Sequence, residues 1–370
     1  MKKIFFSVGE LSGDIHTAKV IEEINKLTSD TSIFALGGNN MKNQGAKLIH
    51  HISETSFMGF SEVIRHLPQL RQIWKNTLHF LKTEKPDLVV LVDYPGFNLR
   101  LAKACYKINI PVVYYISPQV WAWHQSRSKK IKKYTKALFC IQPFEEDWFK
   151  KRDIKATFVG NPLMDEIFSN DSSLPDLKHP DSSHLIGLFP GSRLQETENH
   201  FPIMVEAVKI LKKEFPKLEA HIAVAPGIAI NKYKEQYPMN WLKWTYNRNQ
   251  DLMRQSDFLF MSSGTATLEA AIANTPMTVI YKVSPLTYWL GKKLIKVPFI
   301  SLPNLIGEKE GVTELIQHEA NAVNLANEAL TILKSKIKEL EMRNFLKNVT
   351  NKLGKPGASA RVAKKIIDFL

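Results

Sequence analysis

Short apolar runs typical of β-strands alternate with helical stretches along this chain, and the whole alternation occurs twice. The strand candidates of the two halves occupy residues 3–8, 32–36, 87–93, 111–116, 137–141 and 157–159, then 185–189, 220–225, 242–246, 258–261 and 277–283. Such alternation is typical of a parallel sheet with helices on both faces. The sequence therefore predicts an α/β fold of two doubly wound, Rossmann-like domains.

The chain is long enough for two domains, because 370 residues is about twice the usual ~100–200 residues of one domain. A polar, loosely patterned segment near residues 169–183 is the predicted linker. We predict an N-terminal domain over 1–170 and a C-terminal domain over 171–358. The amphipathic end, 359–370, is expected to pack on the first domain or to pair with another subunit of a homo-oligomer.

Basic residues exceed acidic ones, with 50 Lys+Arg against 36 Asp+Glu and a formal charge of +14. Such a surface favours anionic partners, and nucleic acid, anionic lipid and phosphorylated substrates all qualify. No RNA- or DNA-binding motif is visible, so we expect no nucleic-acid partner. With 44% hydrophobic and 23% charged residues, the composition is that of a folded globular protein.

No apolar stretch of the sequence approaches the ~20 residues that a membrane-spanning helix needs. The apolar start of the chain is too short for a signal peptide because Glu10 interrupts it. We therefore expect a cytoplasmic protein in which Cys105 and Cys140 stay reduced and buried.

Two strand-to-helix turns, PGSR at 190–193 and SSGTATLE at 262–269, have the composition of a diphosphate site. A helix that begins on small residues presents unpaired N–H groups and partial positive charge to an anion. Arg193 adds a cation suited to a leaving diphosphate. The alternative is that both segments are ordinary turns. Because doubly wound domains bind ligands at the carboxyl ends of their strands, two in tandem should face a central cleft.

Asp93 ends a strand of buried type and precedes a Pro-Gly turn, where packing explains a carboxylate poorly. It is our candidate general base, and an N-cap of the following helix is the alternative. Glu10 follows the first strand and has the same two interpretations. Glu269, in the helix that opens near Gly264, is placed to meet a ribose, with a solvated helix face as the alternative.

A basic segment with aromatic side chains follows the strand candidate at 111–116. It contains Trp121, Trp123 and His124, then a run of lysines that begins with Lys129 and Lys130. Cations beside tryptophan suit an anionic membrane surface, at ~1 kcal/mol per cation. Solvated helix faces are the alternative.

Several catalytic signatures are absent from the sequence. They are a Walker P-loop, a G-x-G-x-x-G turn after a strand, a nucleophile elbow, Cys or His at metal-ligand spacing, and an Asp-x-Asp pair. ATP-driven phosphoryl transfer on a P-loop is thereby disfavoured. The sequence predicts a diphosphate site that uses neither metal nor cofactor.

Motifs spread over most of the chain resemble those of the lipid-A-disaccharide synthase family, glycosyltransferases of the two-Rossmann-domain (GT-B) architecture. They are GELSGD at 9–14, FMGFSEV at 57–63, DYPGFNLRLAK at 93–103, SPQVWAW at 117–123, GNPL at 160–163, PGSR at 190–193, SGTATLEAA at 263–271 and SLPNLI at 301–306. Several are specific to this family, whereas SGTATLE resembles helix starts in other nucleotide-sugar transferases.

The resemblance implies an inverting transfer from UDP-2,3-diacylglucosamine to 2,3-diacylglucosamine 1-phosphate, which gives lipid A disaccharide 1-phosphate and UDP. It also implies peripheral binding to the inner face of the inner membrane. Another UDP-N-acetylglucosamine enzyme of this architecture, a 2-epimerase or a peptidoglycan-type transferase, is the alternative.

Together with the residue patterns above, the resemblance assigns the site residues. The expected catalytic residues are Asp93, Glu10 and Arg193. The expected UDP site consists of Arg193, Ser263, Gly264, Thr265, Ala266, Glu269, Asn304 and Gln317, of which Asn304 and Gln317 rest on the resemblance alone. The residues expected to face acceptor or lipid are Ser12, Met58, Trp121, Trp123, His124, Lys129 and Lys130.

Overall fold

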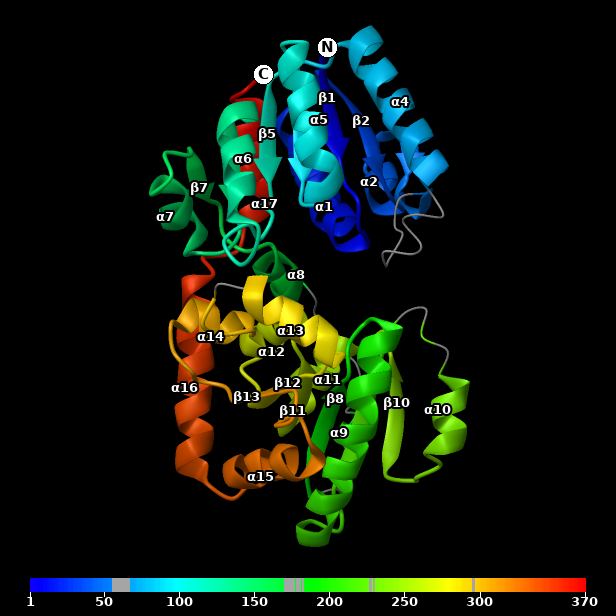
Figure 1. The fold of residues 1–370 in the computed structure, drawn as a ribbon, viewed down its shortest axis with the longest axis vertical. Coiled ribbons are helices and arrows are strands. Elements are labelled where there is room, and N and C mark those ends of the chain that lie inside the picture. The colour runs from blue at the N-terminus through cyan, green and yellow to red at the C-terminus, as the bar shows by residue number, and fades with distance from the viewer. Residues whose placement is uncertain are drawn as a thin grey trace. The chain divides into compact units, whose positions relative to one another are not determined.

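The computed structural model describes residues 1–54, 67–169, 177, 181, 183–225, 228, 230–294 and 297–370. The chain divides into two compact units (Figure 1). Unit 1 comprises Met1–Asp165 and Leu353–Leu370, and unit 2 comprises Glu166–Lys352. Each unit is built around its own parallel sheet.

Unit 1 contains a seven-stranded sheet in the order β3-β2-β1-β4-β5-β6-β7, with parallel neighbours throughout. The strands are β1 (Lys2–Ser7), β2 (Thr31–Gly37), β3 (Lys47–His51), β4 (Leu88–Val92), β5 (Val112–Tyr115), β6 (Ala137–Cys140) and β7 (Ala156–Phe158). The strand order reverses between β1 and β4. The loops that follow these two strands diverge at this point, which is where doubly wound sheets bind ligands.

Helices cover the sheet of unit 1. They are α1 (Leu11–Leu27), α2 (Asn39–Asn43), α4 (Leu67–Glu84), α5 (Pro95–Lys107), α6 (Ser128–Tyr134), α7 (Glu145–Lys150) and α17 (Ala358–Ile367), with 3-10 turns η1 (Ile52–Glu54) and η2 (Gln125–Arg127). Helix α8 (Leu163–Ser169) spans the division between the units.

Strand β1 shows why this sheet needs two helical layers. Ile4 and Phe6 belong to one apolar core and Phe5 to the other, and all three are fully buried. Successive side chains of a strand point to opposite faces, so three consecutive buried apolar residues require cover on both sides of the sheet. The first core also contains Val362 and Ile366 of α17, which packs against α1 (Figure 1).

Asp165 fixes the start of α17, where the chain has returned to unit 1. Its carboxylate accepts backbone hydrogen bonds from Gly357, Ala358 and Ser359 at 2.6, 3.1 and 2.9 Å. The first N–H groups of a helix have no partner within it, and a negative charge there also complements the helix dipole. Asp165 therefore secures a helix that is almost 200 residues away in the chain.

Unit 2 contains a six-stranded sheet in the order β10-β9-β8-β11-β12-β13, again with parallel neighbours. The strands are β8 (Leu185–Phe189), β9 (Glu219–Val224), β10 (Leu242–Tyr246), β11 (Phe258–Ser262), β12 (Met277–Tyr281) and β13 (Glu314–Ile316). The strand order of this sheet reverses between β8 and β11, which correspond to β1 and β4 of unit 1.

Helices also cover the sheet of unit 2. They are α9 (Leu194–Glu214), α10 (Asn231–Gln236), α11 (Asn249–Gln255), α12 (Ala266–Ile272), α13 (Pro285–Leu294), α14 (Leu302–Gly307), α15 (Ala322–Leu333) and α16 (Lys336–Lys352). Helix α15, orange in Figure 1, packs beside α9.

The structure confirms the predicted fold class, since both units are parallel α/β sheets covered by helices. Each strand candidate forms a strand, with small shifts at the ends. Sequence analysis missed β3 and β13. The first reads KLIHH and the second has only three residues, so neither shows an apolar run. Cys105 and Cys140 are free and buried, as predicted.

Candidate functional site

In unit 1 the loops after β1 and β4 are tied together by Asn98, a fully buried residue of α5. Its Nδ2 donates to the carbonyl oxygens of Ser7, Val92 and Asp93 at 3.1, 3.1 and 2.8 Å. Its Oδ1 accepts from the Ser7 hydroxyl at 2.7 Å. Asp93 and Tyr94 have φ of 42° and 49°, a conformation that non-glycine residues keep only where the surroundings impose it.

Asp93 is a mostly buried carboxylate with a shifted pKa. Burial is the first cause that raises its pKa to about 6, and the negative charge of Glu10 is the second, with a smaller contribution from Glu145. A carboxylate whose pKa lies near the working pH suits general base catalysis. Tyr94 occupies the N-cap position of α5, so Asp93 is not the N-cap residue of that helix.

Glu10 reaches the same edge of the sheet because β1 and β4 are neighbours. It occupies the N-cap position of α1 without a side-chain capping hydrogen bond, and it is exposed. Gly9 permits close approach of the two loops, since a Cβ there would lie 2.2 Å from Cγ of Tyr94. Ser12, in the first turn of α1, is also exposed. Glu10 therefore lies close enough to Asp93 for its negative charge to raise the pKa of Asp93.

A buried carboxylate that sequence analysis missed, Glu145, organises the loop after β5. It is 1% exposed and accepts from Ser117 Oγ at 2.5 Å and from Trp121 Nε1 at 2.9 Å. The backbone N–H groups of Ile141 and Gln142 donate to its other oxygen at 3.2 and 3.0 Å. Its place shortly after an apolar strand is the sequence signal that could have found it.

Trp121 therefore belongs to the packed interior of this loop. It is 4% exposed and lies edge-on against Phe144, with ring centroids 4.8 Å apart. The prediction that Trp121 faces acceptor or lipid is therefore wrong, because its indole is buried and its N–H already donates to Glu145.

Trp123 is the exposed aromatic of the same loop, with 43% of its surface accessible. Its ring lies 4.7 Å from the ring of His124 and 5.3 Å from the guanidinium of Arg127. Lys129 and Lys130 are exposed on α6. The remaining residue of this group, Met58, lies outside the described residues.

In unit 2 the loop after β8 leads into α9 with Arg193 at the N-cap. Gly191 has φ of +117°, and a Cβ there would lie 2.4 Å from Oε2 of Glu196, so the turn requires glycine. The guanidinium of Arg193 lies 3.4 Å from Oε1 of Glu196, and the Arg193 side chain is 67% exposed. Such an exposed ion pair contributes little to stability, so the guanidinium is available to an anion.

The loop after β11 lies next to the loop after β8 because these strands are paired. Gly264 and Thr265 are exposed, and a Cβ on Gly264 would meet nothing within 4 Å. Thr265 is the N-cap of α12 and Ala266 its first residue. Ser263 fixes the loop, since its hydroxyl donates at 2.9 Å to a carbonyl of the segment before α14. Two helix starts thus lie at neighbouring strand ends, and helix starts present unpaired backbone N–H groups, which suit an anion.

Asn304 holds a loop, in contrast to its expected contact with UDP. It is fully buried, and its amide donates to the Val312 carbonyl at 2.8 Å and to Glu314 Oε1 at 2.9 Å. Its Oδ1 accepts from the N–H groups of Gly311 and Val312 at 2.9 and 3.0 Å. All four hydrogen-bonding positions of the amide are therefore occupied.

Gln317 holds the loop after β12. Its Oε1 accepts from the Val283 N–H at 2.9 Å, and its Nε2 donates to the Val283 carbonyl at 3.2 Å. Glu269, the remaining member of the expected UDP site, is partly buried in the first turn of α12.

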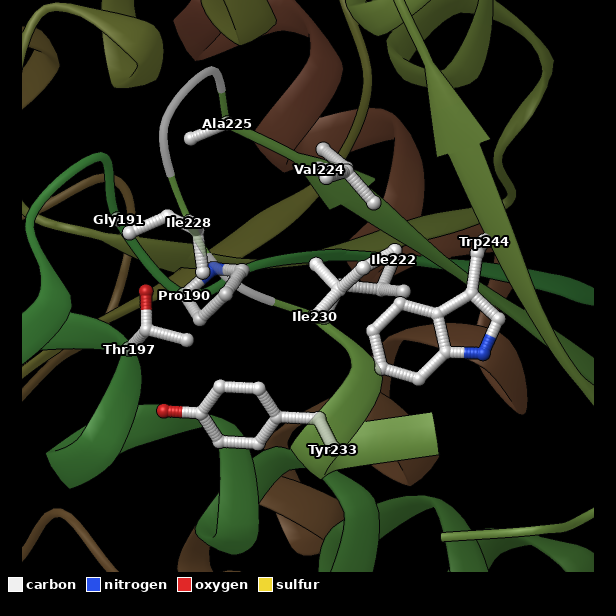
Figure 2. Close-up of a pocket in the computed structure, with 11 residues that line it drawn as sticks. Pro190, Gly191, Thr197, Ile222, Val224, Ala225, Ile228, Ile230, Tyr233 and Trp244 are labelled. Atoms are coloured by element: carbon white, nitrogen blue, oxygen red, sulfur yellow. The ribbon is translucent and has the colours of Figure 1, made fainter. Parts of the chain in front are cut away.

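A pocket of unit 2 borders the loop that contains Gly191 (Figure 2). Pro190, Gly191 and Thr197 lie on one side in this view, and Trp244 lies on the opposite side. The other lining residues are Ile222, Ala223, Val224, Ala225, Ile228, Ile230 and Tyr233. The space beside the proposed diphosphate loop is thus mainly apolar.

Among the described residues, no group of three or more His, Cys, Asp or Glu side chains is placed to hold a metal ion. Across the same ranges, none of the helices combines the length and the apolar character needed to cross a membrane.

Solved structures share the fold at low sequence identity. The UDP-GlcNAc 2-epimerase from Neisseria meningitidis, bound to UDP-GlcNAc, matches with a TM-score of 0.69 at 14% identity, over 99% of this chain and 100% of that one. The calicheamicin glycosyltransferase matches with a TM-score of 0.63 at 14% identity, over 100% of this chain and 98% of that one. These likenesses show the fold alone.

Sequence relatives are more specific. The lipid-A-disaccharide synthase of Myxococcus xanthus is 34% identical over 100% of this chain and 97% of its own length. That of a Sulfurihydrogenibium species is 36% identical over 100% of this chain and 99% of its own length. The family model described as Lipid-A-disaccharide synthetase matches residues 4–364. The chain therefore belongs to the lipid-A-disaccharide synthase family, whose members are glycosyltransferases of lipid A biosynthesis.

Proposed function

We propose that the protein condenses UDP-2,3-diacylglucosamine with 2,3-diacylglucosamine 1-phosphate, giving lipid A disaccharide 1-phosphate and UDP. One observation carries the chemistry: a mostly buried carboxylate, Asp93, lies at the reversal point of the unit 1 sheet with a pKa raised to about 6. Such a group accepts a proton from an alcohol better than an ordinary surface aspartate does.

Asp93 removes the proton of the acceptor's primary hydroxyl as that oxygen attacks the anomeric carbon of the donor. The bond between this carbon and the diphosphate oxygen breaks, and its electron pair leaves with UDP. A single displacement inverts the anomeric configuration, so an α-linked donor gives a β-linked disaccharide. Glu10 contributes through its charge, which helps to keep the pKa of Asp93 high.

The leaving diphosphate gains negative charge as the bond breaks, and unit 2 supplies the groups that stabilise it. Arg193 offers an exposed guanidinium at the start of α9. The backbone N–H groups of Gly264, Thr265 and Ala266 add donors at the start of α12. Glu269 holds the ribose. Asn304 and Gln317 act on the shape of the loops.

The test is product analysis by mass spectrometry with purified protein, detergent and both acylated substrates, with and without EDTA. A disaccharide monophosphate and UDP, formed equally in both samples, is the expected result. An exchange reaction on non-acylated UDP-N-acetylglucosamine, with no disaccharide from the acylated pair, would contradict the proposal and favour an epimerase.

Both substrates carry acyl chains, so the protein must reach them at the inner face of the inner membrane. Exposed Trp123 and the exposed lysines of α6 supply an aromatic and cationic surface for anionic lipid, at ~1 kcal/mol per cation. Ser12, exposed in the first turn of α1, and His124, whose ring lies beside that of Trp123, are the proposed contacts of the acceptor.

Sedimentation with liposomes that contain anionic lipid tests this surface. Replacement of Lys129, Lys130, Lys132 and Lys133 by Ser should abolish most of the binding. The control makes the same charge change at four other exposed lysines of unit 1, Lys82, Lys103, Lys107 and Lys151. An equal loss of liposome binding in both variants would mean that the net charge of the protein, and not this surface, causes the binding.

A further inference from the structure

His200 is a fully buried residue of α9, two turns after the start of that helix. Both of its ring nitrogens have backbone partners. Nδ1 lies 3.0 Å from the carbonyl oxygen of Pro190, and Nε2 lies 3.0 Å from the backbone nitrogen of Lys282. The ring therefore joins the loop after β8 to the loop after β12.

The partners determine the tautomer of this ring. The Lys282 N–H can only donate, so Nε2 must be the unprotonated acceptor, and the Pro190 carbonyl can only accept, so Nδ1 must carry the proton. Burial lowers the pKa of His200, and the hydrogen bond to Pro190 and the charge of Glu196 offset this only in part. A neutral imidazole with one donor and one acceptor is therefore the state that the fold accommodates.

The connection passes across the end of another strand. In the sheet, β11 lies between β8 and β12, and the segment that begins at Ser263 follows β11 directly. The far loop is itself held, because Gln317 makes two hydrogen bonds to Val283 and Asn199 donates to the Lys282 carbonyl at 3.3 Å. His200 thus ties the loop that contains Pro190 to the loop after β12, which is itself held in place.

The bond to Pro190 also orients a donor. In a planar trans peptide the carbonyl and the following N–H point in opposite directions. When the Pro190 carbonyl points at His200, the Gly191 N–H points away from the ring. A carbonyl turned outward would instead present a partial negative charge to an approaching anion.

We infer that His200 is a positioning residue of the donor site, and that its bond to Pro190 keeps the 190–193 loop in the conformation that binds the diphosphate. This inference rests on the proposed donor site. His200 itself touches neither the substrate nor the reacting atoms, and it acts through the backbone of Pro190 and Gly191.

Three variants separate the two bonds of the ring. His200→Asn places an amide nitrogen near the position of Nδ1 and keeps the bond to Pro190. His200→Gln places an oxygen near the position of Nε2 and keeps the bond from Lys282. His200→Leu keeps neither. The matched control is His221→Gln, at another buried histidine of unit 2, whose ring contacts Thr245 at 3.1 Å.

Titration calorimetry with UDP is the primary measurement, with KM for donor and acceptor and thermal unfolding recorded for each variant. We expect UDP binding roughly 5- to 50-fold weaker in His200→Gln and His200→Leu, as for a lost buried hydrogen bond. His200→Asn should bind UDP nearly as well as the wild type. The acceptor KM should stay unchanged, and His221→Gln should lower thermal stability without an effect on UDP.

Wild-type UDP affinity in His200→Gln would overturn the inference, and so would equal losses in the Asn and Gln variants. If His200→Leu does not fold, the Asn and Gln pair still decides. The proposed donor site would also be overturned if the wild-type protein did not bind UDP, or if Arg193→Ala bound UDP as well as the wild type does. Failure of the inference alone leaves wild-type binding intact and sensitive to Arg193.

Discussion

The reversal points of the two sheets have the same topology and opposite chemistry. In unit 1 the loops after β1 and β4 gather carboxylates, with Asp93 and Glu10 close enough for the charge of one to raise the pKa of the other. In unit 2 the loop after β8 carries the exposed Arg193, and the loop after β11 carries the exposed Gly264 and Thr265. The fold supplies the position of a site, and a few loop residues decide its charge.

The buried residues that hold these loops differ in the same way. Asn98 in unit 1 and His200 in unit 2 both bond to loop carbonyls from a fully buried place in the following helix. An amide does not titrate, so it can stand beside a carboxylate of raised pKa without a change of its own charge. An imidazole can titrate, and burial is what keeps the ring of His200 neutral.

The largest expected effect belongs to the base in unit 1. Asp93→Asn should lower kcat about 10²–10⁴-fold, the usual contribution of general base catalysis, while UDP affinity stays at the wild-type level. Single-turnover kinetics and UDP titration measure the two quantities. The control is Asp153→Asn, which removes a charge from a side chain that is 87% exposed. Near-normal turnover in Asp93→Asn would show that Asp93 is not the general base and that its role is structural.

The same substitution should stabilise the fold. Because the pKa of Asp93 is raised from 3.8 to about 6, the folded protein favours the protonated carboxyl. The stability that this contributes is present below pH 3.8 and is lost as the pH rises through 6. Asn cannot ionise, so Asp93→Asn should raise the free energy of unfolding by about 3 kcal/mol at pH 8.

Urea unfolding of both proteins at pH 8 and at pH 4 checks this sign. The advantage of Asp93→Asn should shrink towards zero at the acidic pH, where the wild-type carboxyl is protonated. An equal difference at both pH values would mean that ionisation of Asp93 is not its cause.

In unit 2, Arg193→Ala should weaken UDP binding roughly 10- to 100-fold, the range for one hydrogen bond to a charged group. Arg193→Lys should lie between the wild type and Arg193→Ala, since it keeps the charge and loses the planar pair of donors. Calorimetry with UDP measures all three. Unchanged UDP affinity in Arg193→Ala would mean that the diphosphate binds elsewhere, and that the loops of unit 2 do not form the anion site that distinguishes them from those of unit 1.

The smallest expected effect concerns the pH profile. Activity should rise with pH through a midpoint near 6, because Asp93 must lose its proton to act as a base. Glu10→Gln removes the negative charge that helps to raise this pKa, so the acidic limb of kcat/KM should move to lower pH by a fraction of a unit. Glu235→Gln, at an exposed position of unit 2, should not move it.

Sequence reasoning found the residues at strand ends and missed those inside helices. Asp93 stands out because it directly follows an apolar strand, and Arg193 because it ends a Pro-Gly-Ser turn that leads from a strand into a helix. Asn98, Glu145 and His200 lie within or at the start of helices, where polar residues are common. Only their burial and their partners reveal Asn98 and His200, whereas Glu145 also follows an apolar strand closely.

The parallel α/β fold of both halves follows from the sequence, since a strand such as β1 is apolar on both faces and can be buried only between two layers of helices. The sequence also located the loops that follow those strands. Only the tertiary structure shows which side chains are available to a ligand. All hydrogen-bonding positions of the Asn304 amide are occupied within the protein, and the buried indole of Trp121 donates to Glu145. The tertiary structure also decided that α17 packs on α1, with Asp165 at its start. These outcomes depend on contacts between residues far apart in the chain, and a pattern of neighbouring residues does not contain them.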